Sequence, residues 1–367
     1  MTKIKLLIAI SLISGGYLCS AQSIGRHSIC KIKYPNARPV YSQQELSQKE
    51  IQPVLAYCLD IWQRATFDTS NLKIQVMSSP LENDALAITT IGKFFKGIQN
   101  SPFPDSWHPV SLAEHIVQKD LNDGLYDLTI TLNSEVNWYL GIDGKTPYEK
   151  FDLATILLHE LAHGFGFLSS ASVSNGIGEL GINGDVVVFD HIIEGENGTK
   201  LSHISTPSET LENFLTKEKL YIQQGSSSIR AQLYTPSVFL ANSSLNHFDP
   251  GFLDRQGYES FMQPVIAPGY SYHTLEKDTL LMDALRAIGW SRSGYFSGSV
   301  FPNPSNGVVN ISLDGHIVQR MEVLDLFGKT LNWERLSENQ ISIKNKGTCV
   351  LVMEIDHKKH YKLLIIR

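Results

Sequence analysis

Hydrophobic and polar positions follow two different periods in the first half of the chain. Within residues 48–66, apolar side chains recur every three or four positions, which predicts an amphipathic helix. Pro53 lies near the start of this segment, where a helix tolerates proline. Residues 72–76 and 128–132 instead alternate apolar with polar side chains, which predicts two half-buried strands. This mixture of helix and strand predicts an α+β domain.

The second half of the chain changes character twice. Residues 164–246 are irregular, with several glycines close together, and we expect a large insertion with its own loops. Ser and Gly then dominate residues 291–299, and strand-like runs follow at 308–313, 321–326, 349–355 and 361–366. We therefore predict a first domain of residues 22–295 and a small all-β sandwich of residues 296–367.

The first 21 residues have the pattern of a secretory signal peptide. Lys3 and Lys5 precede an apolar run at 6–13, and small and polar residues follow up to a predicted cleavage site after Ala21. The apolar run is too short to cross about 30 Å of hydrocarbon, so we expect no transmembrane anchor. A lipoprotein site at Cys19 is a weaker alternative, because bulky residues precede that cysteine. The pattern predicts an exported protein.

Composition and charge exclude several classes of protein. The chain has 367 residues, 42% of them hydrophobic, which is enough for a large core and argues against disorder. The formal charge of −6, without any basic run, excludes a nucleic-acid binder. After signal cleavage only Cys30, Cys58 and Cys349 remain, which excludes a disulfide scaffold. A Cys30–Cys58 bridge and a pair of buried free thiols both stay open.

Residues 156–167 carry the clearest chemical signal, an H-E-x-x-H motif within an apolar run. His159 and His163 are separated by about 40° around a helix and by about 6 Å along it, so both imidazoles can reach one tetrahedral zinc ion. Glu160 projects beside them, where it can take a proton from water that zinc has acidified. The helix can begin at a capping box in residues 146–149 or at Asp152.

The alternative to a zinc site is a helix that contains these three residues by chance. Ionisable side chains buried among leucine and isoleucine without partners would cost several kcal/mol, and a metal ion supplies the missing partner. The apolar flanks of the motif therefore favour zinc. A catalytic zinc site usually has three protein ligands, so a third one is required.

The motif resembles that of the metzincin peptidases, H-E-x-x-H-x-x-G-x-x-H. His159, Glu160, His163 and Gly166 match it, but Ser169 stands at the position of the third ligand. The leishmanolysin branch, which this sequence resembles more closely, has an insertion there, and its third histidine comes tens of residues later, shortly before a Met-turn. The resemblance implies His247 as the third metal ligand and Met262 as the methionine below the metal.

The resemblance covers about residues 62–290. It implies a metzincin-like fold with a twisted mixed sheet and an active-site helix, in which residues 128–133 form an edge strand and residues 279–290 the closing helix. Competing metal ligands remain, although we expect them to be structural, and His191 follows a strand-like run. These competitors are His191, His203, His273, Glu179, Asp185 and Asp190.

The tail resembles the C-terminal sorting domain of the type IX secretion system of Bacteroidota. The resemblance rests on residues 300–307, 323–329 and 346–351, with Cys349 at a position where an aromatic residue is more usual. It implies passage through the periplasm and across the outer membrane by the type IX machinery, to the cell surface or the medium. A carbohydrate-binding or spacer sandwich is the alternative.

Together these features predict a secreted zinc metalloendopeptidase that hydrolyses proteins or peptides, with Glu160 as general base and zinc bound by His159, His163 and His247. One alternative is a surface adhesin that keeps a metzincin-like scaffold around a structural zinc ion. Another is a zinc hydrolase that acts on a non-peptide substrate.

Overall fold

The computed structural model divides the chain into two compact units, Met1–Trp290 and Ser291–Arg367. The predicted boundary at residues 295/296 and the predicted signal peptide lie outside the described residues. Within the described part, no helix is both long and apolar enough to cross a membrane. The structure describes residues 22–24, 27–33, 46–66, 72–81, 84–223, 230–275, 277–290, 300–311, 318–325, 329–337, 339–355 and 358–367.

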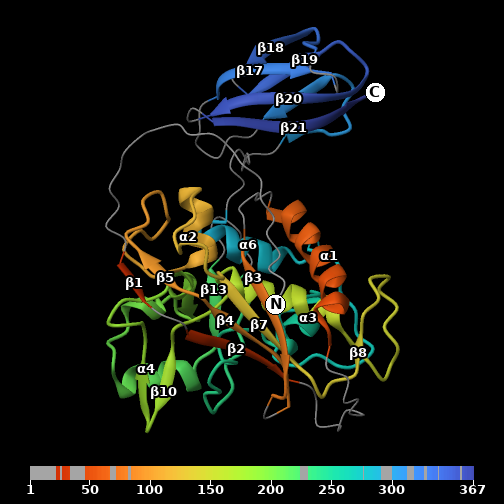
Figure 1. Cartoon of the computed structure of the whole chain (residues 1–367). Coiled ribbons are helices and arrows are strands. Elements are labelled where there is room, and N and C mark those ends of the chain that lie inside the picture. Colours follow the sequence, from red (N-terminus) through yellow and green to blue (C-terminus); the bar gives the residue numbers. More distant parts are fainter. Residues whose placement is uncertain are drawn as a thin grey trace. The chain divides into compact units, whose positions relative to one another are not determined.

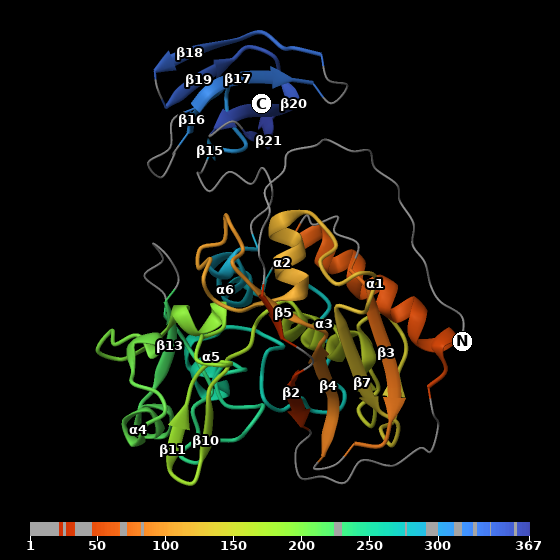
Figure 2. The same cartoon turned by 60° about the vertical axis from the view of Figure 1, so that its left-hand side comes forward.

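A four-stranded sheet forms the framework of the first unit (Figures 1 and 2). Its order is β2-β4-β7-β3, in which β3 and β7 are parallel and the other neighbours antiparallel. The strands are β2 (His27–Lys33), β3 (Ile74–Ser79), β4 (Ala85–Ile91) and β7 (Leu128–Asn133). The expectation of an edge strand at residues 128–133 was wrong, because β4 and β3 flank β7 on both sides.

Two helices pack in succession against this sheet. Helix α3 (Leu153–Gly164) is buried along its whole length and contacts β4 and β7, and α1 (Gln48–Thr66) packs on α3. Trp62 of α1 lies edge-to-face on Phe165, with ring centroids 4.9 Å apart. The predicted bounds of α1 are confirmed. Burial of α3 from both sides explains why its sequence is apolar around its full circumference.

Helix α3 begins at Asp152. The Asp152 carboxylate accepts hydrogen bonds from the Thr155 backbone N–H (2.8 Å) and from the Thr155 hydroxyl (2.6 Å), so it satisfies a backbone donor that the first helical turn leaves without a partner. The alternative start at residues 146–149 is wrong, since those residues precede the short strand β9 (Phe151–Asp152).

The region between α3 and residue 246 contains short elements only. The strand-like run before His191 is a 3-10 helix, η1, which corrects the prediction of a strand there. The elements are β10 (Ser172–Ser174), β11 (Ile177–Glu179), η1 (Val188–Ile192), β12 (Ile193–Gly195), η2 (Leu201–His203), α4 (Glu209–Lys217), β13 (Leu220–Gln223) and β14 (Arg230–Gln232). Strands β12, β13 and β14 form one small sheet.

Short elements complete the first unit around the sheet and α3. The expected closing helix is present as α6, which ends at Ile288. The elements are β1 (Gln22–Ile24), β5 (Phe94–Lys96), β6 (His108–Pro109), α2 (Val110–Val117), β8 (Trp138–Tyr139), α5 (Pro250–Gln256) and α6 (Thr279–Ile288).

The second unit is all-β, and each of the four predicted runs contains a strand. One sheet has the order β15-β16-β19-β18 and the other β17-β20-β21, and side chains from both sheets share one core that includes Cys349. The strands are β15 (Val300–Phe301), β16 (Val308–Ile311), β17 (Val318–Leu324), β18 (Trp333–Ser337), β19 (Gln340–Ile343), β20 (Gly347–Ile355) and β21 (Lys358–Ile366). Strands β15, β18 and β19 lie outside the four predicted runs.

Candidate metal centre

Three histidine side chains from two distant parts of the chain converge in the first unit. His159 and His163 lie one turn apart on α3, and their Nε2 atoms are 2.9 Å apart. His247 comes from the loop before α5, and its Nε2 lies 3.3 Å from that of His159. All three side chains are completely buried. Among the histidine, cysteine and acidic side chains in the described part of the chain, these three lie close enough together to hold a metal ion.

Backbone carbonyl groups orient all three rings. The Nδ1 atom of His159 lies 2.8 Å from the Phe261 carbonyl oxygen, that of His163 2.8 Å from Phe167, and that of His247 2.9 Å from Ser243. A carbonyl oxygen only accepts, so each Nδ1 carries the hydrogen and donates it. Each neutral ring therefore presents an Nε2 lone pair to the centre of the group.

Burial keeps these rings neutral. It holds the pKa of His159 and that of His163 well below the usual histidine value, and the neighbouring rings lower both further. Burial also lowers the pKa of His247 to about 4. At neutral pH the Nε2 atoms are unprotonated, and three lone pairs at these distances repel one another unless a cation lies between them.

The donor set and its spacing fit zinc. Three imidazole nitrogens are the ligands of many catalytic zinc ions, and Zn–N bonds of about 2.0–2.1 Å at tetrahedral angles place the nitrogens about 3.3 Å apart. The observed separations of 2.9 and 3.3 Å are close to this value. The hydrogen bonds from each Nδ1 to a carbonyl oxygen are the outer contacts that a zinc-binding histidine normally makes.

Glu160 lies between the two histidines of α3 and is also completely buried. Its Oε2 accepts a 2.6 Å hydrogen bond from the hydroxyl of Thr89 on β4, whereas its Oε1 has no hydrogen-bond partner in the described part of the chain. Burial raises the pKa of Glu160 to about 8, although the hydrogen bonds from Thr89 oppose this shift. The carboxyl group is therefore poised to gain or lose a proton near neutral pH.

Met262 lies in a buried turn that holds two of the three ligands in place. Its backbone carbonyl accepts a hydrogen bond from Phe248, which follows His247, and the preceding Phe261 carbonyl accepts the one from His159. The side chain of Ser260 stabilises this turn. Its hydroxyl accepts a hydrogen bond from the Met262 N–H and donates one of 2.7 Å to Asp278 Oδ2. The resemblance implied Met262 as the methionine below the metal; its buried turn connects to two of the ligands through backbone hydrogen bonds, and the place of its side chain below the metal stays a prediction.

The competing ligand candidates lie apart from the three histidines. His191 stacks on Phe103 and contacts the Ser106 hydroxyl, and His273 contacts the Asp152 carboxylate. His203 ends η2, and Glu179 is an exposed residue of β11. The carboxylate of Asp185 pairs with Lys96, and that of Asp190 binds Ser169 and Ser170. The contacts or positions of these six side chains account for them without a bound metal ion.

Two other observations bear on the sequence predictions. Cys58 is a buried free thiol whose Sγ donates to the Ala154 carbonyl of α3, which favours the free-thiol alternative for that residue. Thr89 was not identified from the sequence as a residue of the site. A threonine in an alternating strand has the same sequence pattern whether its side chain faces solvent or a carboxylate. Only the pairing of β4 with α3 distinguishes it.

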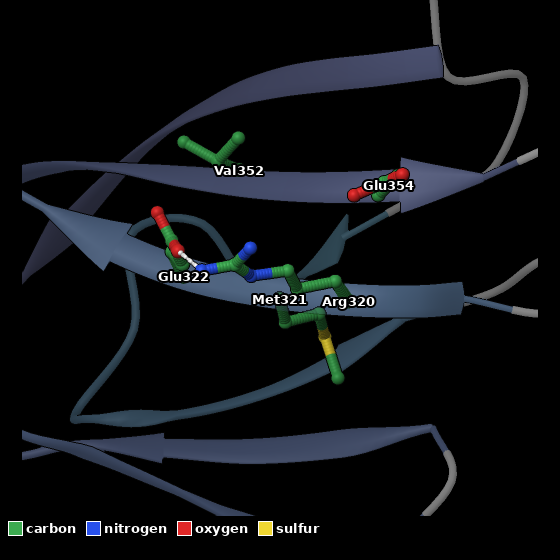
Figure 3. Close-up of a pocket in the computed structure, with 5 residues that line it drawn as sticks. All are labelled: Arg320, Met321, Glu322, Val352 and Glu354. Carbon is green, nitrogen blue, oxygen red and sulfur yellow. Dashed lines mark hydrogen bonds and ion pairs between the residues drawn. The ribbon is translucent and has the colours of Figure 1, made fainter. Parts of the chain in front are cut away.

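A shallow depression lies on the face of β17 and β20 (Figure 3). Arg320 and Glu322 form a 2.6 Å ion pair there, next to Val352 and Glu354 of the neighbouring strand. Met321 points away from them, into the core of the unit (Figure 3). Both side chains of the ion pair are partly open to solvent, where such pairs contribute little to stability.

Comparison with known proteins gives a partial match in the first unit. A family model described as SPBPB7E8-like matches residues 118–178, a stretch that includes all of α3. The Schizosaccharomyces pombe protein named "Uncharacterized protein PB7E8.01" is 33% identical in an alignment 104 positions long, which covers 23% of this chain and 18% of that protein. The chain thus spans less than a fifth of the length of this curated relative. No solved structure matches the chain.

The tail has a clear match. The family model of the secretion system C-terminal sorting domain matches residues 299–367, which contain every strand of the second unit. This match confirms the predicted sorting domain and disfavours the carbohydrate-binding or spacer alternative. The tail implies an interaction with the type IX secretion machinery. The chain therefore ends in a type IX secretion sorting domain, and the protein is exported to the cell surface or the surrounding medium.

Proposed function

We propose that this exported protein is a zinc-dependent endopeptidase. The observation that carries the proposal is the convergence of three Nε2 lone pairs, two of them from the helix that also carries the buried carboxyl group of Glu160. His159, His163 and His247 would hold the ion. Because the described part of the chain contributes three ligands to this group, one tetrahedral position is left for water or substrate, as in catalytic zinc sites.

When bound, zinc supplies a Lewis acid that acidifies water and polarises a carbonyl group. Glu160 acts as the base that removes a proton from the attacking water. Its Oε1 is the oxygen available for this proton, since Oε2 is held by the Thr89 hydroxyl. The same carboxyl group then gives the proton to the amine that leaves when the peptide bond breaks.

The test separates metal binding from catalysis. Glu160→Ala should retain zinc and lose proteolysis of an unfolded protein by at least 100-fold, because general base catalysis contributes about 10²–10⁴-fold. His247→Ala should lose zinc, whereas the matched variant His191→Ala should keep both zinc and activity, because His191 lies outside the group. Zinc content and proteolysis are measured on the same preparations. Wild-type rates in Glu160→Ala would disprove the mechanism.

The complete burial of the three ligands favours one alternative, a surface adhesin that contains a structural zinc ion. A structural zinc usually has four protein ligands and no need of a base. If the alternative is correct, wild-type protein contains zinc but does not cleave peptides, and Glu160→Ala changes neither property.

A further inference from the structure

Ser169 occupies the position at which the H-E-x-x-H-x-x-G-x-x-H pattern has its third histidine. It lies near the start of the long insertion and contacts one residue within the insertion and one at its end. Its backbone N–H donates a 2.7 Å hydrogen bond to Oδ1 of Asn246, the residue before His247. Its hydroxyl donates a 2.6 Å hydrogen bond to Oδ1 of Asp190 in η1. All three residues are buried, with 8% or less of their surface exposed.

Asp190 makes this connection rigid. Its carboxylate accepts hydrogen bonds from the backbone N–H of Ser170 and of Val187 as well as from the hydroxyls of Ser169 and Ser170. An acidic group without exposure needs such partners, because its burial otherwise costs several kcal/mol. Asp190 therefore locks η1 to the segment that follows α3.

Aromatic side chains connect the same three segments. The ring of Phe167 lies 4.7 Å from that of Phe189 and 5.1 Å from that of Phe248, measured between centroids. Phe189 precedes Asp190, and Phe248 follows His247. The Phe167 carbonyl also accepts the hydrogen bond from His163 Nδ1. The segment 167–169 thus contacts His163 on one side and the neighbours of His247 on the other.

We propose that Ser169, Asp190 and Asn246 are positioning residues that place His247 against the two histidines of α3. Ser169 and Asn246 are 77 positions apart in the sequence, so local chain geometry does not fix His247 relative to α3, and their hydrogen bond joins the two segments in addition to the turn at residues 260–262. This inference rests on the proposed function, because it assigns a role in holding a zinc ligand.

Zinc titration of the metal-free full chain tests the proposal. Asn246→Ala removes the amide oxygen that accepts the Ser169 N–H, and it should weaken zinc binding about tenfold, the lower end of the effect of removing a supporting contact at a metal site. Ser169→Ala keeps that backbone N–H and removes the hydroxyl that binds Asp190, so it should weaken zinc binding by a smaller factor. Ser169→Thr keeps the hydroxyl and should restore binding to near the wild-type level. Ser208→Ala is the matched control. It removes a hydroxyl that caps α4 in the same insertion, so it should lower the melting temperature and leave zinc affinity unchanged.

Amide hydrogen exchange supplies a readout that needs no zinc. In the metal-free protein, peptides covering residues 243–248 should exchange several times faster in Asn246→Ala than in wild type or Ser208→Ala. Wild-type zinc affinity in Ser169→Ala and Asn246→Ala, or unchanged exchange in residues 243–248, overturns the inference while the zinc site stands. If wild-type protein binds no zinc at all, the proposed function fails, and the exchange result still decides whether these residues fix His247.

Discussion

The hydroxyl of Thr89 carries one hydrogen, and two oxygens of Glu160 lie within its reach. The side-chain Oε2 is 2.6 Å away and the backbone carbonyl 3.0 Å, so the hydrogen points mainly to the carboxylate. Thr89 lies on β4, the strand on which α3 packs, and it is completely buried. It therefore holds one oxygen of Glu160 and stabilises the ionised form of that carboxyl group, because a carboxylate accepts the bond more strongly than a carboxylic acid.

Thr89→Val removes this donor and keeps the shape of the side chain. We expect the pKa of Glu160 to rise further, since the ionised form loses a hydrogen bond while burial persists. The activity of the variant should fall about tenfold at neutral pH, which corresponds to the loss of one charge-assisted hydrogen bond. The acidic side of its pH–activity profile should move to higher pH. Zinc content should not change. The pH dependence of kcat/KM measures the effect, with Thr89→Ser as the variant that restores it. A pH profile in Thr89→Val identical to that of wild type would contradict this role.

The turn at residues 260–262 connects His159 of α3 with Phe248, which follows His247, and the start of α6 supports this turn. Asp278 caps α6 by accepting a hydrogen bond from the Leu281 N–H, and its other oxygen accepts the Ser260 hydroxyl. Burial raises the pKa of Asp278 from 3.8 to about 7, although these hydrogen bonds oppose the shift. An acid whose pKa is higher in the folded state binds extra protons there, so stability is full below about pH 4 and declines as pH rises toward 7.

Asp278→Asn keeps a good capping residue and removes the ionisable group. Relative to this variant, wild type should therefore lose about 2–3 kcal/mol of unfolding free energy between pH 5 and pH 8, given a folded-state pKa of about 7. Urea unfolding of both proteins at the two pH values measures the difference, in which all other titrating groups cancel. An equal stability gap at pH 5 and pH 8 would show that Asp278 does not titrate as described.

Local elements were predictable from the sequence where one helix or strand determines them. The bounds of α1 follow from its apolar spacing, and His159 and His163 come together because one helix carries both. His247 lies 88 positions from His159, and no local pattern marks it, so only the resemblance to a known motif indicated it. The interior place of β7 depends on its pairing with β4 and β3, which lies outside the reach of a local pattern. Thr89, Ser169 and Asn246 gain their roles from the same long-range contacts.

At the scale of the whole molecule, the chain consists of two units with separate hydrophobic cores. The larger core surrounds α3 and the histidines, and the smaller one fills the space between the two sheets of the sorting domain. Because each unit has its own core, we expect the two units to unfold independently.

Scanning calorimetry of the full chain should show two transitions, and zinc should raise the temperature of one of them. A ligand that binds only the folded form of one unit stabilises that unit by mass action and leaves the other unchanged. The unit that responds is Met1–Trp290, which contains the histidines. A chelator should reverse the shift, and His247→Ala should abolish it. A single transition that zinc raises as a whole would mean that the two units unfold together.

The carbonyl groups that orient the histidines have a consequence for the charge balance of the site. Phe261, Phe167 and Ser243 accept the Nδ1 hydrogens through their backbones, so these partners bring no formal charge. Among the residues described here as ligands or as their partners, Glu160 is the single acid, against the two positive charges of a zinc ion. The loaded site would keep a surplus of one positive charge even with Glu160 ionised. Small anions that reach it should therefore be attracted to the zinc-loaded protein and act as inhibitors, with an effect that weakens as the salt concentration rises.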